Sequence, residues 1–194
     1  VTHIDVTTLD KPKAKEIRKM LDGYGLTISS LAYYPNPLHP EADHRETVIA
    51  HLKKVIEAAA RLEVPVVGTF VGKDKNKTVP QNLEDYARVW PPIVKFAKEH
   101  RVKIAIENCP MIFSYDEWPG GVNLASTPAI WEEMFELVPS PGFGLNFDPS
   151  HLLWQGVDPV EFIRAFPDRI YHVHIKDAIV TLNGKSGILS SHIN

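Results

Sequence analysis

Three side chains that can bind a metal lie at the ends of short apolar runs in the sequence. Glu107 and Asp148 each come directly after such a run, and His174 lies near the end of a third. A single acidic residue at such a position is more often a helix cap or a solvated loop residue, but three ligands on successive runs favour one shared site. Two carboxylates and a neutral imidazole suit Mn²⁺, Mg²⁺, Co²⁺ or Zn²⁺ and leave coordination positions open for substrate oxygens.

Further polar residues flank these three. His172 and His174 point to the same side of a strand because side chains alternate; we expect His174 to be the ligand and His172 to pack one layer below it. His151 lies three residues beyond Asp148 and could bind the metal or a substrate hydroxyl, or be a surface loop residue. Lys176 follows His174 and could orient it or bind substrate.

Several other candidates are weaker. Tyr33 and Tyr34 end an apolar run and could line a sugar pocket, although core packing explains them equally well. Packing is the safer interpretation for Trp118 and Trp154. Cys109 has no evident base beside it, which favours a buried, inert thiol.

The elements that must position these residues alternate between strand and helix patterns. Helical patterns follow the runs, which predicts a parallel sheet covered by helices. Either an open doubly wound sheet or a (β/α) barrel fits, and the lack of a Gly-x-Gly-x-x-Gly motif after a strand weakens the dinucleotide-binding form of the first. The predicted strands span residues 1–6, 26–32, 66–71, 102–106, 143–147 and 170–175.

Helix boundaries are marked by capping residues and prolines. A helix over residues 13–24 should end at Gly25, and the next should begin with a capping box of Asp43 and Glu46. A third, over residues 81–100, should be kinked or split by Pro91 and Pro92. Two more should begin where Thr127 and Asp158 each precede a proline.

The strand-end strings resemble a known family. They are similar to the sugar phosphate isomerase/epimerase group of the xylose isomerase-like TIM-barrel superfamily, and the resemblance covers nearly the whole chain. It implies a (β/α)8 barrel with one divalent metal held by a glutamate, an aspartate, a histidine and a second glutamate on the last four strands. The strings that carry it are Ile106-Glu107-Asn108, Asn146-Phe147-Asp148-Pro149-Ser150-His151, His172-Val173-His174-Ile175-Lys176-Asp177 and Gly68-Thr69-Phe70-Val71-Gly72.

By motif match, Glu107, Asp148 and His174 would be three of these ligands. His151 matches a histidine that touches substrate, or a further metal in the endonuclease relatives, and His151 and Lys176 are the predicted substrate-binding residues. The family activity is isomerisation or epimerisation of a small sugar, polyol or keto-acid, by proton removal next to a carbonyl through a metal-stabilised enediolate. Glu107 would then be both ligand and catalytic acid/base.

Three alternatives stay open. An inositol-ketone dehydratase-like lyase would use the same site. An endonuclease IV-like abasic-site nuclease would need histidines at earlier strand ends, where this sequence has Ala32-Tyr33-Tyr34 and Phe70-Val71-Gly72. A barrel that has lost its activity would not be expected to retain all three ligands.

Composition sets outer bounds on the protein. The 194 residues form one predicted domain, 1–194, with 44% hydrophobic residues and a net charge of -3, which argues against a nucleic-acid partner. Apolar runs are too short to span a bilayer, and one cysteine excludes an internal disulfide; both fit a cytoplasmic protein, and a homo-oligomer is compatible.

The barrel predicted for this chain is incomplete. Aligned by motif, residues 1–6 match the family's second strand and the His174 strand its seventh, so the first and last strands are expected to be missing. The second family glutamate would then lie beyond Asn194. We expect the 194-residue chain alone to aggregate or be inactive, because an open sheet exposes unpaired edges, and a longer parent protein to be active.

Overall fold

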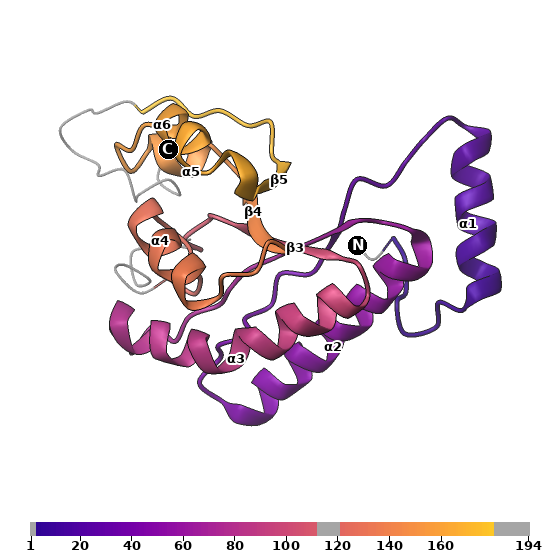
Figure 1. The fold of residues 1–194 in the computed structure, drawn as a ribbon, viewed down its shortest axis with the longest axis horizontal. Coiled ribbons are helices and arrows are strands. Elements are labelled where there is room, and N and C mark those ends of the chain that lie inside the picture. The colour runs from indigo at the N-terminus through magenta and orange to yellow at the C-terminus, as the bar shows by residue number, and fades with distance from the viewer. Residues whose placement is uncertain (1–2, 112–120, 181–194) are drawn as a thin grey trace.

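A computed structural model describes residues 3–111 and 121–180. Its described residues form one five-stranded sheet in which neighbours along the chain are neighbours in space and every pair is parallel (Figure 1). This order is that of a barrel wall rather than of a doubly wound sheet, whose strand order reverses. The strands are β1 (Leu31–Ala32), β2 (Val66–Thr69), β3 (Lys103–Glu107), β4 (Phe143–Phe147) and β5 (Ile170–Val173).

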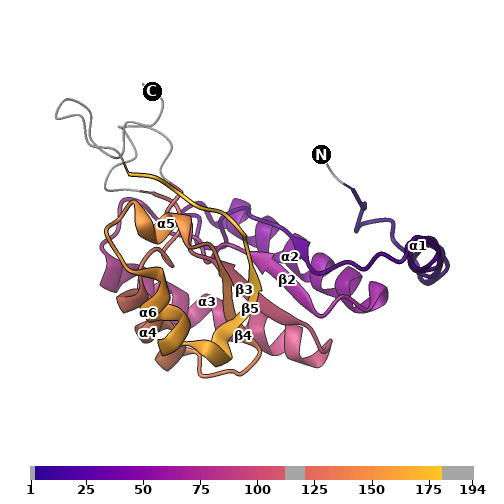
Figure 2. The same ribbon diagram turned by 90° about the horizontal axis from the view of Figure 1, so that it is seen from above.

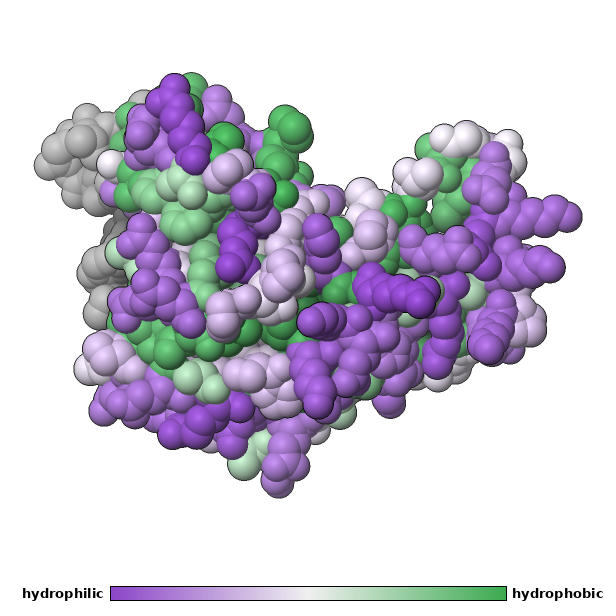
Figure 3. All heavy atoms as spheres, in the orientation of Figure 1, coloured by the Kyte–Doolittle hydropathy of each residue, from purple (hydrophilic) through white to green (hydrophobic). Residues whose placement is uncertain are grey.

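Helices connect successive strands. In both ribbon views α1 stands apart from the sheet, at the opposite end of the molecule from α4 and α6 (Figures 1 and 2). Helix α1 contacts α2, and the side of the molecule that α1 and α2 form is largely hydrophilic (Figure 3). The helices are α1 (Lys11–Gly23), α2 (Ala42–Leu62), α3 (Val79–Glu99), α4 (Pro128–Leu137), α5 (Ser150–Leu153) and α6 (Pro159–Ala165), followed by the 3-10 turn η2 (Pro167–Arg169).

The core lies between the sheet and the long helices. Trp90 of α3 and Trp131 of α4 are fully buried, and the Trp90 ring lies 5.6 Å from that of Phe143 on β4. The Trp90 indole donates a hydrogen bond of 3.1 Å to the Val71 carbonyl. Since buried aromatic rings supply large apolar contact areas, this packing fixes the carboxyl end of β2 relative to α3.

The expected strands at the N-terminal end of the chain are corrected by the structure. Residues 3–6 of the predicted strand 1–6 form bends and turns, and of residues 26–32 only Leu31 and Ala32 pair with β2. Asp5 accepts hydrogen bonds from the Thr7 amide and the hydroxyls of Thr7 and Thr8. These local bonds compete with extended pairing, which an alternating apolar pattern does not reveal.

The capping box expected for α2 does not form, and α3 is not split at its prolines. Helix α2 begins at Ala42 with Glu41 as N-cap and, among the described residues, no side-chain capping bond, so the Asp43–Glu46 capping box does not form. Asp43 lies within the first turn instead, where its negative charge still interacts favourably with the positive end of the helix dipole. Pro91 and Pro92 do not split α3, which continues to Glu99.

The position of the two prolines explains why α3 continues. Pro91 and Pro92 are exposed, as is Arg88, one of the two residues whose carbonyls lose their amide partner. A carbonyl that faces water loses little, so the helix tolerates the prolines. Elsewhere the markers are confirmed: α1 ends just before Gly25, which has φ +64°, and Asp158 caps α6.

Candidate functional site

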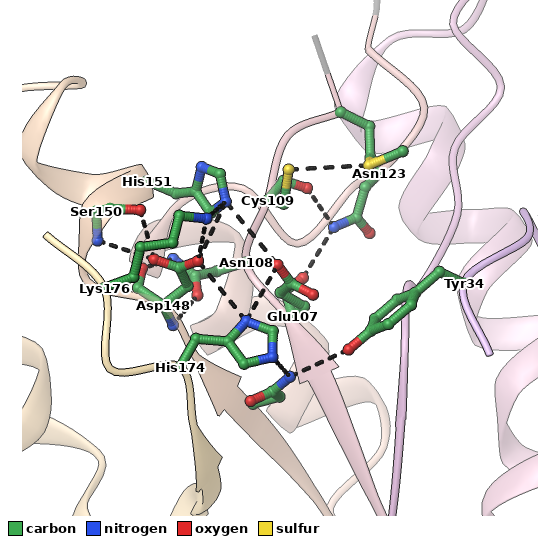
Figure 4. A network of polar contacts seen from close by, with 12 residues as sticks. Tyr34, Glu107, Asn108, Cys109, Asn123, Asp148, Ser150, His151, His174 and Lys176 are labelled. Atoms are coloured by element: carbon green, nitrogen blue, oxygen red, sulfur yellow. Dashed lines mark hydrogen bonds and ion pairs between the residues drawn. The ribbon is translucent and has the colours of Figure 1, made fainter. Parts of the chain in front are cut away.

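The three predicted ligands lie together at the carboxyl ends of adjacent strands (Figure 4). Glu107 is the last residue of β3. Asp148 comes directly after the last residue of β4, and His174 comes directly after the last residue of β5. Because the strands are parallel and in register, with Glu107 opposite Asn146, their carboxyl ends deliver these side chains to one edge. The carboxylates come from well-buried positions, Glu107 being 8% and Asp148 0% exposed.

The donor atoms of this triad converge. One ligand atom from each of Glu107, Asp148 and His174 lies within 4.8 Å of the other two. His174 Nδ1 is 3.4 Å from Glu107 Oε1 and 3.7 Å from Asp148 Oδ2. Two oxygens and one imidazole nitrogen at this spacing fit a divalent cation with open positions.

Asp148 is held so that one oxygen faces the site. Its Oδ1 accepts hydrogen bonds from the Ser150 amide at 3.0 Å and the Ser150 hydroxyl at 2.5 Å. Its amide donates to Asn108 Oδ1 at 2.7 Å, and Asn108 Nδ2 donates back to the Asp148 carbonyl at 2.9 Å. These bonds leave Oδ2 for a cation.

A cationic side chain contacts that free oxygen. Lys176 Nζ lies 2.7 Å from Asp148 Oδ2 and 3.3 Å from His151 Nε2. Burial opposes ionisation of Asp148, but hydrogen bonds from Lys176 and Ser150 outweigh it and lower the pKa of Asp148 below its usual value. The pocket therefore already accommodates positive charge beside this carboxylate.

The pKa of Glu107 is raised above its usual value, in contrast to that of Asp148. Burial raises it, and the neighbouring Asp148 charge raises it further, whereas His174 and a hydrogen bond from Tyr34 oppose the shift. Two carboxylates whose pKa values are pushed apart are the usual arrangement of an acid/base group beside a permanently charged one.

Asn146 organises the imidazoles and was not predicted as a functional residue. Its Nδ2 contacts His174 Nε2 at 3.0 Å and donates to the Tyr34 hydroxyl at 3.3 Å, and its Oδ1 contacts His172 Nδ1 at 2.9 Å. The signal in the sequence was an amide on an otherwise apolar strand, two residues before Asp148. His172 lies one layer below His174, as predicted, with Nε2 3.1 Å from the Ser29 hydroxyl.

Asn123 also went unrecognised, and it links the backbone at the end of β3 to the loop after β2. Its Nδ2 donates to the carbonyls of Glu107 at 2.9 Å and Cys109 at 2.6 Å, and its Oδ1 accepts from the Val71 amide at 3.1 Å. It comes from the loop before α4, where its sequence context carries no indication of this role.

Some of the other predicted residues lie in the site, and others lie away from it. His151 Nε2 is 3.4 Å from Asp148 Oδ2 and 3.9 Å from Glu107 Oε1, so His151 lies in the site; burial lowers its pKa. Trp154 contacts His151 through its indole nitrogen at 3.5 Å. Tyr33 packs instead on His51 with ring centroids 4.5 Å apart. Trp118 lies outside the described residues.

Tyr34 reaches the site across the inner face of β2. A side-chain carbon on Gly68 would lie 3.2 Å from the Tyr34 hydroxyl, so a larger residue there would crowd the ring. Burial, and then the charge of Glu107, raises the pKa of Tyr34, which keeps it a neutral hydrogen-bond donor.

Comparison with known families agrees with this architecture. The family described as xylose isomerase-like TIM barrel matches residues 2–194. The chain belongs to this family. Its five parallel strands and their helices are thus part of a TIM barrel, and within the described ranges this barrel has no helix long and apolar enough to cross a membrane.

Named relatives of this TIM barrel are longer than the chain. It is 30% identical over 207 residues to the uncharacterized protein YfiH of Bacillus subtilis, covering 97% of this chain and 64% of that protein. It is 24% identical over 141 residues to inosose dehydratase of Clostridium tetani, covering 69% of this chain and 42% of that protein.

Solved structures share the fold. The crystal structure of D-psicose 3-epimerase with D-tagatose from Clostridium cellulolyticum matches with a TM-score of 0.70 at 17% identity, over 87% of this chain and 59% of that one. At this identity the likeness establishes the fold alone. The chain spans less than two thirds of the length of each of these three proteins.

Proposed function

We propose that the protein is a metal-dependent isomerase or epimerase that removes and returns a proton next to the carbonyl of a small sugar, polyol or keto-acid. The observation that carries this proposal is the convergence of Glu107, Asp148 and His174 within 4.8 Å at the carboxyl ends of adjacent barrel strands. These three residues would hold one divalent cation, Mn²⁺, Mg²⁺, Co²⁺ or Zn²⁺, which supplies Lewis-acid stabilisation of negative charge on the substrate oxygens.

Glu107 is the proposed acid/base. As a carboxylate it accepts the proton from the carbon next to the carbonyl, which leaves an enediolate, and as a carboxylic acid it returns the proton. Its raised pKa brings both forms closer to neutral pH, which favours such exchange.

His151 and Lys176 are the proposed substrate-binding residues. The Lys176 side chain is half exposed at the mouth of the site and ends at Asp148, so it can turn toward a substrate oxygen without disturbing the core. His151 lies beside it and can hydrogen-bond a hydroxyl through Nε2. Asp177 is exposed, with its carboxylate accepting from the Ala178 amide, and we assign it no role.

Proton exchange in heavy water tests the proposal without knowledge of the product. Ketoses and inositol ketones would be incubated with the purified full-length parent protein and Mn²⁺, and deuterium uptake next to the carbonyl would be followed by NMR. We expect uptake that is lost in Glu107→Gln, with His3→Gln, which lies outside the site, as a matched control. Deuterium uptake that persists in Glu107→Gln would remove Glu107 from its proposed role.

A lyase is the second candidate, favoured by the similarity to inosose dehydratase. It would begin with the same proton abstraction and then expel hydroxide from the enediolate. Loss of water from an inositol ketone, followed by mass spectrometry, separates the two reactions: an epimerase product keeps the substrate mass, and a lyase product is lighter by one water.

A nuclease is disfavoured. The ends of β1 and β2 lead into Tyr34 and Phe70, whose ring centroids are 4.6 Å apart, where the endonuclease relatives would need histidines. We expect no metal-dependent cleavage of an abasic DNA duplex, and efficient nicking of such a duplex would establish the nuclease assignment instead.

A further inference from the structure

We propose that the protein has a second cation site, formed by Glu107, Cys109 and His151, which binds Zn²⁺ in preference to Mg²⁺ or Mn²⁺. This site shares Glu107 with the first triad but uses a sulfur in place of an aspartate. It is a binding property that stands independently of the proposed isomerase activity, because it involves no substrate.

The geometry gathers three ligand atoms at one point. One atom each from Glu107, Cys109 and His151 lies within 4.8 Å of the other two, and His151 Nε2 is 3.9 Å from Glu107 Oε1. Ligands of tetrahedral Zn²⁺ are separated by about 3.5 Å, given metal–ligand distances of about 2.0–2.3 Å. Small rotations of the side chains therefore complete the site, with one position open to water.

The backbone that carries Cys109 is fixed. Asn123 Nδ2 donates to the carbonyls of both Glu107 and Cys109, which holds the two ligands at a set spacing in the loop after β3. In the close-up view Cys109 lies above Glu107 while His174 lies below it (Figure 4). Both histidines approach the same carboxylate oxygen, with His151 Nε2 3.9 Å and His174 Nδ1 3.4 Å from Glu107 Oε1, so Glu107 is the ligand that the two triads share.

A second sulfur lies beside Cys109. Met111 Sδ is 3.8 Å from Cys109 Sγ, and Met111 has a φ of +59°. A left-handed conformation is uncommon for a residue other than glycine, and such strain is often found at functional sites. The thiolate and the thioether favour a soft cation, whereas the two carboxylates of the first triad suit hard ones.

The ammonium group of Lys176 must move away for this cation to bind. Lys176 Nζ contacts His151 Nε2 at 3.3 Å, and an ammonium group only donates, so Nε2 presents its lone pair toward the site. The half-exposed Lys176 side chain can swing into solvent. Cys109 would lose its proton to solvent as Zn²⁺ binds.

The consequence for Glu107 follows from the shared carboxylate. A cation in each triad would place two positive charges on the Glu107 carboxylate, which lowers its pKa and weakens it as a proton acceptor. We expect excess Zn²⁺ to block proton exchange by occupying the second site.

Co²⁺ is a suitable spectroscopic stand-in for Zn²⁺. The purified protein would first be saturated with Mn²⁺, followed by electron paramagnetic resonance, and then titrated with Co²⁺. We expect a thiolate-to-cobalt charge-transfer band in the near ultraviolet, absent in Cys109→Ser, and a Co²⁺ affinity in that variant at least about tenfold lower, in line with loss of a metal ligand. Competition with Zn²⁺ should abolish the band.

Two variants separate this site from the first. Cys109→Ser should bind Mn²⁺ within about twofold of the wild-type affinity, while Asp148→Asn should lose Mn²⁺ and keep the cobalt–thiolate band. Circular dichroism would verify that both variants fold. A wild-type protein that shows no thiolate band, or a band unchanged in His151→Asn, would overturn the proposal, and neither result bears on Mn²⁺ binding by the first triad.

Discussion

The strands β4 and β5 lie side by side in the sheet, but they differ in solvent exposure. All five residues of β4 are buried, whereas β5 has none buried among its four, and Ile175 just beyond it is 99% exposed. Both strands end at the same site. Asp148 after β4 is held by Asn108 and Ser150, while His174 after β5 has its backbone amide on the Phe147 carbonyl at 2.9 Å and its ring on Asn146.

This difference separates a rigid half of the site from an adjustable one. The carboxylates of Glu107 and Asp148 project from the packed core and cannot relax away from each other, so they attract a cation. The imidazole of His174 and the ammonium of Lys176 approach from the exposed strand, where a change of position costs little packing. We expect substitutions in the buried half to have the larger effects.

The largest effect should come from the core beneath the carboxylates. Ile106→Ala removes a fully buried side chain next to Glu107 and should lower the free energy of unfolding by about 3 kcal/mol, through lost burial and the cavity left behind. The matched variant Ile175→Ala alters an exposed isoleucine on the adjustable half of the site and should change the free energy of unfolding by less than about 0.5 kcal/mol. Urea unfolding of the two variants measures both, and equal losses would show that the two halves are equally packed.

The next largest effect should come from removing one of the two carboxylates. Asp148→Ala should weaken Mn²⁺ binding at least about tenfold, since loss of a direct ligand exceeds the effect of losing a residue that only orients one. It should also destabilise the fold by about 2 kcal/mol, because two bonds from Ser150 to a charged oxygen are lost. His174→Ala should weaken Mn²⁺ binding as well but leave stability nearly unchanged. Isothermal titration and urea unfolding would separate the two effects, and unchanged metal affinity in Asp148→Ala would exclude it as a ligand.

The pH dependence of stability should distinguish the two carboxylates in the metal-free protein. The folded-state pKa of Asp148 is lowered, so its contribution is present above the unfolded value of about 3.9 and is lost as pH falls through the folded pKa. The pKa of Glu107 is raised, so its contribution is present below about 4.3 and is lost as pH rises through the folded pKa.

Each variant should therefore flatten a different limb of the stability curve. Asp148→Asn should remove the acid limb and Glu107→Gln the limb above about pH 4.3, each unit of pKa displacement corresponding to about 1.4 kcal/mol. Urea unfolding from acid to neutral pH provides the curves. If both variants altered the same limb, the opposed shifts of the two groups would be refuted.

The smallest effect should be that of Lys176, on the adjustable half. Lys176→Met should change stability by less than about 1 kcal/mol, as is usual for a partly exposed ion pair. It should strengthen Mn²⁺ binding a few-fold, because no ammonium group then competes for Asp148 Oδ2. Weaker Mn²⁺ binding in Lys176→Met would show instead that Lys176 supports the cation site.

Strong apolar runs and the polar residues that end them could be predicted from the sequence. The strands β2, β3 and β4 are largely buried on both faces, so most of their residues are apolar and they could be located to within a residue or two. Glu107 and Asp148 stood out for the same reason, since a polar group at the end of a buried strand requires a partner, and His174 stood out by its place near the end of the next apolar run. The parallel fold follows from the alternation of such runs with helices, and these features are local.

Only the tertiary structure decided which residues from distant segments meet. Asn123 acts through carbonyls 14 and 16 positions away, and its neighbours in sequence carry no trace of those partners. The strand predicted over residues 1–6 failed because Asp5 satisfies nearby donors locally, and the capping box failed because the helix begins two residues earlier than its motif suggests. Cys109 is predicted to be a buried thiol, and burial raises its pKa. That its sulfur lies within 4.8 Å of ligand atoms of Glu107 and His151 was decided by the tertiary structure, because distances between side chains on different elements are set by packing rather than by spacing along the chain.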